Sequence, residues 1–189
     1  NVKFYQASSS EMFGNSNTQI QNEQTSFSPA SPYAAAKLYA HWITKIYQEA
    51  YDMFAVSGIL FNHESPIRGL EFVTRKITNA AAQIKLGLKK DISIGNLQSK
   101  RDWGYAPEYM EAIYLMMQQD KPETYVISTG ETYSVEELAK VSFEILNLDW
   151  KDYVKTDEKY FRPLDINLLR GDYSKAKDEL GWEPKTKFH

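Results

Sequence analysis

The 189-residue chain contains no cysteine, which excludes disulfide bonds, thiolate catalysis and zinc–thiolate sites. Its three histidines, His41, His63 and His189, are too scattered to predict a metal cluster. No apolar run approaches the roughly 18 residues that a membrane-spanning helix needs. The net charge of -3 and the pI of about 5.7 provide no basic field for nucleic acid. We therefore expect a soluble, cytoplasmic protein that uses no metal and binds neither nucleic acid nor membrane.

The residues that are present suffice for a folded core, because 42% of them are hydrophobic and 14% are aromatic. A chain of 189 residues fits one domain, or one domain plus part of another. It begins at Asn1 inside a predicted strand and ends at residues 187–189, where an apolar element starts. We therefore expect it to be part of a longer protein.

Apolar patterning predicts strands that alternate with helices, which is typical of an α/β sheet. The segment 54–61 is almost entirely apolar, as expected for a parallel strand buried on both faces. Strands are predicted at residues 1–6, 54–61, 91–94 and 124–128, and helices at 33–51, 72–88, 107–119 and 134–146. Predicted apolar stripes comprise Tyr39, Ile43, Ile46, Tyr47 and Ala50 in the first helix, and Tyr109, Met110, Ile113 and Met117 in the third.

Tyr33 and Lys37 stand one turn apart at the start of the first predicted helix. Ser31 is a typical N-cap, and Pro32 is a typical first helical residue. An ammonium group near a phenol favours the phenolate, so the pair can take a proton from an alcohol. The same spacing also arises by chance, with the tyrosine packed and the lysine solvated.

Other polar residues are predicted to lie near this pair. Residues 8–11 follow the first strand and residues 62–64 follow the buried strand, while Tyr33 begins the helix between them. Ligands of open α/β sheets bind outside the carboxyl ends of the strands. Each cluster has a plain interpretation as turn or solvent-facing residues, but their convergence on one edge favours a site.

Two sets of motifs resemble a known family. Residues 8–11 (SSSE) followed by Tyr33-x-x-x-Lys37 resemble the extended short-chain dehydrogenases/reductases. Across the rest of the chain the sequence is similar to the GDP-mannose 4,6-dehydratase family, in residues 60–66 (LFNHESP), 68–69 (RG), 72–76 (FVTRK) and 100–104 (KRDWG).

This resemblance implies the C-terminal part of a Rossmann-like parallel sheet plus a smaller α/β substrate-binding region. Residues 1–66 then form the remainder of an NADP-binding domain with the catalytic residues, and 67–189 form mostly the GDP-sugar-binding region, with a crossover back to the first part. The family's amino-terminal half carries a glycine-rich dinucleotide loop, which is absent here because no two glycines lie closer than eight residues.

The resemblance also implies catalytic roles in the dehydration of GDP-mannose with NADP. Tyr33 is the base on the 4-hydroxyl of the hexose, and Lys37 also holds the nicotinamide ribose. Glu11 removes the C5 proton, which a 4-ketone acidifies, as water leaves C6. Ser9 stands where the family usually has threonine and donates a hydrogen bond to the 4-oxygen.

Binding residues follow from the same resemblance. His63 and Arg68, with Tyr33 and Lys37, are expected to contact NADP. Asp165 stands where the family usually has glutamate. The residues expected to approach the GDP-sugar are Ser10, Asn62, Glu71, Val73, Lys76, Arg101, Arg162 and Asp165. The family also suggests a homo-oligomer.

Three other interpretations stay open. The chain could belong to a sister sugar-nucleotide epimerase or 4-keto reductase, neither of which needs a C5 base such as Glu11. It could be a non-catalytic module that only binds a GDP-sugar or a partner subunit. It could also be purely structural, with the polar residues at the sheet edge incidental.

Overall fold

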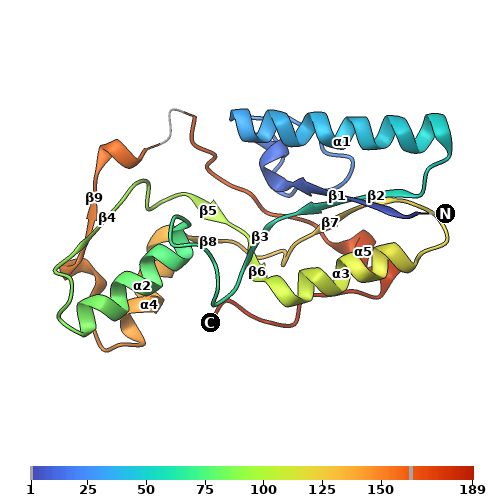
Figure 1. Ribbon diagram of the computed structural model, residues 1–189. Helices are drawn as coiled ribbons and strands as arrows, with labels where there is room; N and C mark the ends of the chain where they lie inside the picture. The colour runs from blue at the N-terminus through green and yellow to red at the C-terminus, as the bar shows by residue number, and fades with distance from the viewer. Residues whose placement is uncertain (1, 162–163) are drawn as a thin grey trace.

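The computed structural model describes residues 2–161 and 164–189, and it shows a parallel three-stranded sheet with a second lobe beside it (Figure 1). The sheet has the order β1-β2-β7, with β1 at Phe4–Ser9, β2 at Ala55–Leu60 and β7 at Thr124–Ile127. All six residues of β2 are buried, which confirms the prediction of a strand covered on both faces. None of the helices in the described residues is both long and apolar enough to cross a bilayer.

Helices cover both faces of this sheet. Helix α1 (Pro32–Tyr51) packs on β1 and β2 from one side, while α3 (Ala106–Gln118) and α5 (Ser174–Leu180) lie on the other side (Figure 1). The core on the side of α3 includes Tyr109, Met116 and Trp182. Strand β2 therefore supplies apolar surface to both layers, as the α/β class requires.

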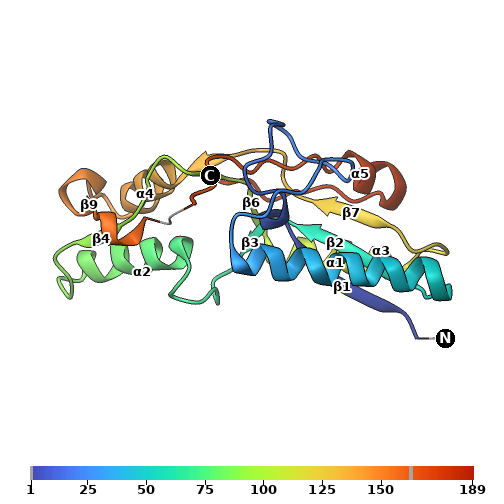
Figure 2. The same cartoon turned by 90° about the horizontal axis from the view of Figure 1, so that it is seen from above.

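The second lobe has a core of its own. Helices α2 (Val73–Lys85) and α4 (Val135–Glu144) pack against each other beside the two short parallel strands β4 (Ile92–Ile94) and β9 (Val154–Thr156). Figure 2 shows these elements at one end of the molecule and the three-stranded sheet at the other. Four short strands lie between the two groups: β3 (Asn62–Glu64) pairs with β6 (Trp103–Tyr105), and β5 (Lys100–Arg101) pairs with β8 (Tyr133–Ser134).

Most predicted elements are confirmed within a few residues, including the capping box formed by Ser134 and Glu137 at the start of α4. Two strand predictions need correction. Strand β1 continues through Ser9, because it pairs with β2 residue by residue up to Leu60, so its backbone groups are bonded despite the serines. Residues 62–64, expected only to follow the buried strand, form the short strand β3, since they pair in parallel with β6. Elements that the sequence did not predict are β5, β6, β8, β9, α5 and three 3-10 turns: η1 (Ser10–Phe13), η2 (Trp150–Asp152) and η3 (Glu158–Tyr160).

The apolar stripe predicted on α1 does not face the core. The buried residues of α1 are instead Ala34, His41 and Thr44. Polar groups of this face bond to β1, and the partly buried Leu38 also packs against the core. Met110 of α3 is likewise half exposed rather than inward. The exposed members of the α1 stripe include Tyr39, Ile46 and Tyr47.

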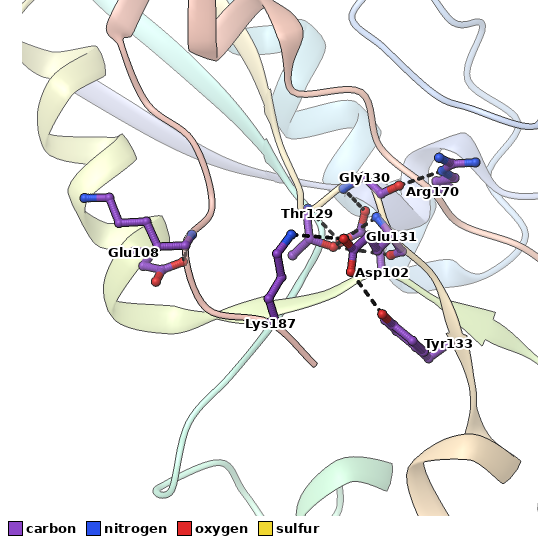
Figure 3. Close-up of polar contacts among 9 residues, drawn as sticks. Asp102, Glu108, Thr129, Gly130, Glu131, Tyr133, Arg170 and Lys187 are labelled. Atoms are coloured by element: carbon purple, nitrogen blue, oxygen red, sulfur yellow. Dashed lines mark hydrogen bonds and ion pairs between the residues drawn. The ribbon is translucent and has the colours of Figure 1, made fainter. Parts of the chain in front are cut away.

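A buried carboxylate joins the segments that meet between the sheet and the second lobe (Figure 3). Asp102, fully buried after β5, accepts hydrogen bonds from the backbone N–H and Oγ1 of Thr129 at 2.8 and 2.7 Å. It also accepts from the backbone N–H groups of Gly130 and Gly171 at 3.0 and 3.3 Å. Burial raises the pKa of Asp102 to about 6 although these bonds act in the opposite direction. Asp102 thus ties β5, the end of β7 and the C-terminal segment together.

Candidate active site

The turn that follows β1 places the predicted serines and glutamate. Ser9 is the N-cap of η1, and its Oγ accepts a hydrogen bond from the N–H of Glu11 at 3.2 Å. Ser9 and Ser10 are 8% and 2% exposed, whereas Glu11 is partly exposed. The turn ends at Gly14, whose φ of 54° and ψ of -135° are accessible essentially to glycine alone. Glu11 is therefore held by a defined turn rather than by a flexible loop.

The start of α1 places Tyr33 and Lys37, and the two predicted start signals are confirmed. Ser31 Oγ accepts from the N–H of Ala34 at 3.1 Å, and Pro32 is the first residue of the helix. The Tyr33 side chain is exposed, while Lys37 Nζ donates to the carbonyl oxygen of Ala7 at 2.9 Å. Lys37 Nζ also lies 5.7 Å from the centre of the Tyr33 ring. The lysine therefore fixes α1 to β1 and keeps its charge near the tyrosine.

His63 lies on β3, beside the end of β2. Its Nδ1 is 2.8 Å from the carbonyl oxygen of Phe61, and its ring stacks on Tyr109 at 5.1 Å between ring centres. These contacts fix the plane of the imidazole. The position of His63 beside the end of β2 agrees with the predicted role in a site at the carboxyl end of the sheet.

A cavity of about 280 Å³ lies between the end of the sheet and α2. It brings together most of the predicted substrate residues, although they are up to 154 positions apart from Glu11 to Asp165. A cavity of this volume with convergent polar groups is typical of a small-molecule site. The predicted residues that line it are Glu11, Asn62, Arg68, Glu71, Val73, Lys76, Arg101 and Asp165.

The remaining predicted residues do not line this cavity. Ser9, Ser10, Tyr33, Lys37 and His63 belong to the neighbouring ends of β1, α1 and β3. Ser9 and Ser10 connect to the cavity through Glu11, whose N–H is bonded to Ser9, and His63 connects through Asn62, which precedes it. Lys37 is bonded instead to Ala7 of β1. Arg162 lies outside the described residues.

Two cations of the cavity, Lys76 and Arg101, are fixed by carbonyl groups. Lys76 Nζ donates to the carbonyl oxygen of Ser93 at 2.8 Å and lies 4.2 Å from the centre of the Tyr160 ring. The guanidinium of Arg101 donates to the carbonyl oxygen of Ile166 at 2.7 Å. Ordered cations of this kind suit a diphosphate, because little side-chain entropy remains to be lost on binding.

The carboxylate of Asp165 is already engaged by the protein. Its Oδ2 accepts from Asn96 Nδ2 at 2.9 Å and from Ser99 Oγ at 2.7 Å, and Arg101 lies 3.6 Å from Oδ1. Burial alone would raise the pKa of Asp165, but these two hydrogen bonds and the arginine charge lower it. Asn96 and Ser99 also line the cavity, and no motif in the sequence pointed to them.

Arg68 is held on the cavity wall by Glu64 and Phe72. Its Nε lies 3.3 Å from the Glu64 carboxylate, and its guanidinium carbon lies 3.6 Å from the centre of the Phe72 ring. Glu64 also accepts a hydrogen bond of 2.5 Å from Thr74 Oγ1 at the start of α2. This contact orders the beginning of α2, where the predicted Val73 and Lys76 lie.

The parallel sheet with a Tyr-x-x-x-Lys helix beside a polar cavity agrees with the class that the sequence resembles, the extended short-chain dehydrogenases/reductases. Solved structures share this fold. Over 98% of this chain, a dTDP-glucose 4,6-dehydratase from Bacillus anthracis in complex with NAD matches with a TM-score of 0.86 at 24% identity, covering 58% of that chain. RMD from Pseudomonas aeruginosa, complexed with NADPH, matches 98% of this chain and 62% of its own with a TM-score of 0.87 at 21% identity.

Sequence comparison identifies the family within this class. The profile of the GDP-mannose 4,6-dehydratases matches residues 1–189, and the chain belongs to this family. GDP-mannose 4,6 dehydratase 2 of Arabidopsis thaliana is 58% identical over 187 residues, which cover 99% of this chain and 50% of that protein. The human GDP-mannose 4,6 dehydratase is 49% identical over 204 residues, covering 99% of this chain and 55% of its own length. The chain thus spans about half the length of the curated relatives it matches.

Proposed function

We propose that the protein containing this chain dehydrates GDP-mannose to GDP-4-dehydro-6-deoxy-D-mannose, the first step towards GDP-fucose and other GDP-deoxyhexoses. Family membership supports this proposal. The observation that carries it is the position of Glu11, whose side chain lines the cavity that also contains Lys76 and Arg101. A carboxylate there can act on a sugar whose diphosphate is bound by the two cations.

The cofactor of the proposal is NADP, which when bound would supply the acceptor for the hydride from C4 of the sugar and the donor of that hydride to C6. The exposed residue Tyr33 with Lys37 beside it fits the nicotinamide end of such a cofactor. His63 and Arg68 are proposed as further contacts. NADPH in one structural neighbour and NAD in another support a nicotinamide dinucleotide, and the choice of NADP rests on the family resemblance.

In the proposed reaction each group of the chain handles one proton or one oxygen. Tyr33 takes the proton of the 4-hydroxyl, and Ser9 donates a hydrogen bond to the oxygen. The resulting ketone acidifies the C5–H bond, whose proton Glu11 removes and passes to the 6-hydroxyl, which leaves as water. When the hydride reaches C6, C5 takes up the proton that Tyr33 accepted from the 4-hydroxyl. General acid–base help of this kind contributes about 10²–10⁴-fold per group.

The binding roles are part of the same proposal. Lys76 and Arg101 bind the diphosphate, because ammonium and guanidinium groups match phosphate oxygens. In this proposal residues 1–66 form the remainder of the NADP-binding domain, and residues 67–189 form mostly the GDP-sugar-binding region. We also propose that the protein is cytoplasmic. The other residues proposed to contact the GDP-sugar are Ser10, Asn62, Glu71, Val73, Arg162 and Asp165.

Turnover of GDP-mannose tests the proposal directly. The 189 residues are joined to the part of the Arabidopsis relative that lies outside the match, and the product is identified by mass spectrometry and NMR. We expect loss of one water from the sugar with no net consumption of NADP. A C4 epimer or a reduced sugar as product contradicts the dehydratase and favours a sister enzyme. GDP-mannose binding without any product contradicts an enzyme and favours a binding module.

We also propose that the protein forms a homo-oligomer, with a second copy covering the exposed apolar side of α1. Tyr39, Ile46 and Tyr47 are 70%, 51% and 48% exposed and share one stripe of this helix. An exposed apolar stripe on one element favours a protein interface. We expect the joined protein to elute as an oligomer in light-scattering chromatography and the double variant Tyr39→Lys/Ile46→Lys to shift it towards monomer. A monomeric parent protein contradicts the proposal.

A further inference from the structure

Three residues of α1 lie on one face of the helix, because Tyr33, Lys37 and His41 are spaced four residues apart. Lys37 donates to the carbonyl oxygen of Ala7 at 2.9 Å. One turn further along, His41 Nδ1 lies 2.9 Å from the Oγ of Ser8. Two consecutive residues of β1 are therefore bonded by two consecutive turns of α1.

The bond between Ser8 and His41 lies inside the protein. The two residues are 4% and 5% exposed, and the Phe27 ring and the imidazole pack edge to face at 5.3 Å between ring centres. Burial lowers the pKa of His41, and the charge of Lys45 lowers it further. A neutral imidazole and a hydroxyl, both buried, share one hydrogen bond, and removing either group leaves the other buried without this partner.

The two bonds from α1 to β1 differ in stiffness. The lysine has a flexible four-carbon stem, so its ammonium can follow the carbonyl of Ala7 if the helix shifts. The imidazole of His41 has two side-chain torsions and is packed on Phe27, so it cannot follow Ser8 in the same way. The geometry of α1 relative to β1 is therefore determined mainly by His41.

We propose that His41 is a positioning residue, which through Ser8 fixes where α1 lies on the end of β1. The inference rests on the proposed function, in which α1 carries the base Tyr33 and the turn after β1 carries Glu11. These two groups must act on neighbouring carbons of one sugar. A displacement of about 1 Å between such groups can cost about 10²-fold in rate.

The test uses the joined full-length protein and four variants. His41→Phe keeps the aromatic packing and removes Nδ1, and we expect kcat to fall about 10–100-fold with little change in the KM for GDP-mannose. His41→Asn places an amide near the position of Nδ1, and we expect it to recover most of the lost kcat. Ser8→Ala is expected to match His41→Phe, and the double variant to lose no more than either single variant.

Thr44→Val is the matched control. Thr44 is buried on the same helix, but its hydroxyl bonds to the carbonyl oxygen of Ala40 within α1 at 2.8 Å. We expect its kcat to equal that of the parent protein. Unchanged kcat in His41→Phe, no recovery in His41→Asn, or a comparable loss in Thr44→Val overturns the inference.

A second readout separates the inference from the proposed function. Thermal unfolding of the Ser8 and His41 single and double variants measures their coupling without any turnover. Non-additive effects on unfolding are expected, and additive effects contradict the positioning role even in an active enzyme. A parent protein that shows this coupling but forms no product instead contradicts the proposed function, and with it the positioning role.

Discussion

Replacing Glu11 by glutamine is expected to lower the dehydration of GDP-mannose by about 10²–10⁴-fold. The substitution keeps the size of the side chain and the backbone N–H that bonds to Ser9. It removes the carboxylate that we propose to take the C5 proton at the cavity wall. An amide cannot accept that proton, so elimination of water has no base. The rate is measured as product formed by the joined full-length protein.

Exchange of the C5 proton with deuterated water locates the defect. Glu11→Gln is expected to abolish exchange while leaving the affinity for GDP-mannose nearly unchanged. The matched control is Glu49→Gln, which removes one exposed carboxylate from α1 and is expected to behave as the parent protein. Turnover by Glu11→Gln within a few-fold of the parent would exclude Glu11 as the C5 base.

The convergence of distant residues on one cavity was predictable from the sequence. Glu11 follows β1 and Asn62 follows β2, and both line the cavity. The prediction succeeded because the two strands are parallel, so their carboxyl ends meet at one edge. It needed the order of elements and the polar residues that follow them, but no detail of side-chain contacts.

Contacts between single residues far apart in the chain were not predictable. Lys37 is bonded to a carbonyl 30 positions away, and Asp102 is bonded to groups 27 to 69 positions away. Most of these partners are backbone N–H or carbonyl groups. Since almost every residue has the same backbone groups, the sequence contains no pattern that predicts which of them will be bonded. The roles of Asn96 and Ser99 beside Asp165 were missed because side-chain hydrogen bonds between positions 69 and 66 apart leave no local pattern in the sequence.

Periodicity identified which residues of α1 share a face but not which face is buried. The stripe with Tyr39 and Ile46 has the spacing of a core-facing surface, yet the helix packs on β1 through Ala34, His41 and Thr44. On the face that packs on β1, Lys37 bonds to Ala7 and His41 bonds to Ser8, and these bonds fix which side of α1 faces the sheet. Hydrophobicity alone therefore gave the wrong inward side.

Gly14→Ala is expected to lower the free energy of unfolding by more than about 3 kcal/mol. At its φ of 54° and ψ of -135°, an L-residue is strained by about 1–3 kcal/mol. A Cβ at this position would also lie 1.7 Å from the carbonyl oxygen of Ser28, so the backbone must move. The change is measured as the shift in thermal unfolding midpoint, at about 2–4 °C per kcal/mol.

Gly87→Ala separates the two causes of that loss. Gly87 also has a positive φ, 71°, but no atom lies within 4 Å of the added Cβ. Its expected cost is only the backbone strain, about 1–2 kcal/mol. The excess in Gly14→Ala therefore measures the contact with Ser28 together with the added backbone strain at the ψ of -135°. The N–H of Ser28 is bonded to the carbonyl oxygen of Met12 within the turn that carries Glu11. Because that turn holds Glu11 at the cavity, we expect Gly14→Ala to lose turnover along with stability, whereas Gly87→Ala retains turnover. Equal destabilisation of the two variants would show that Ser28 does not hold the turn closed.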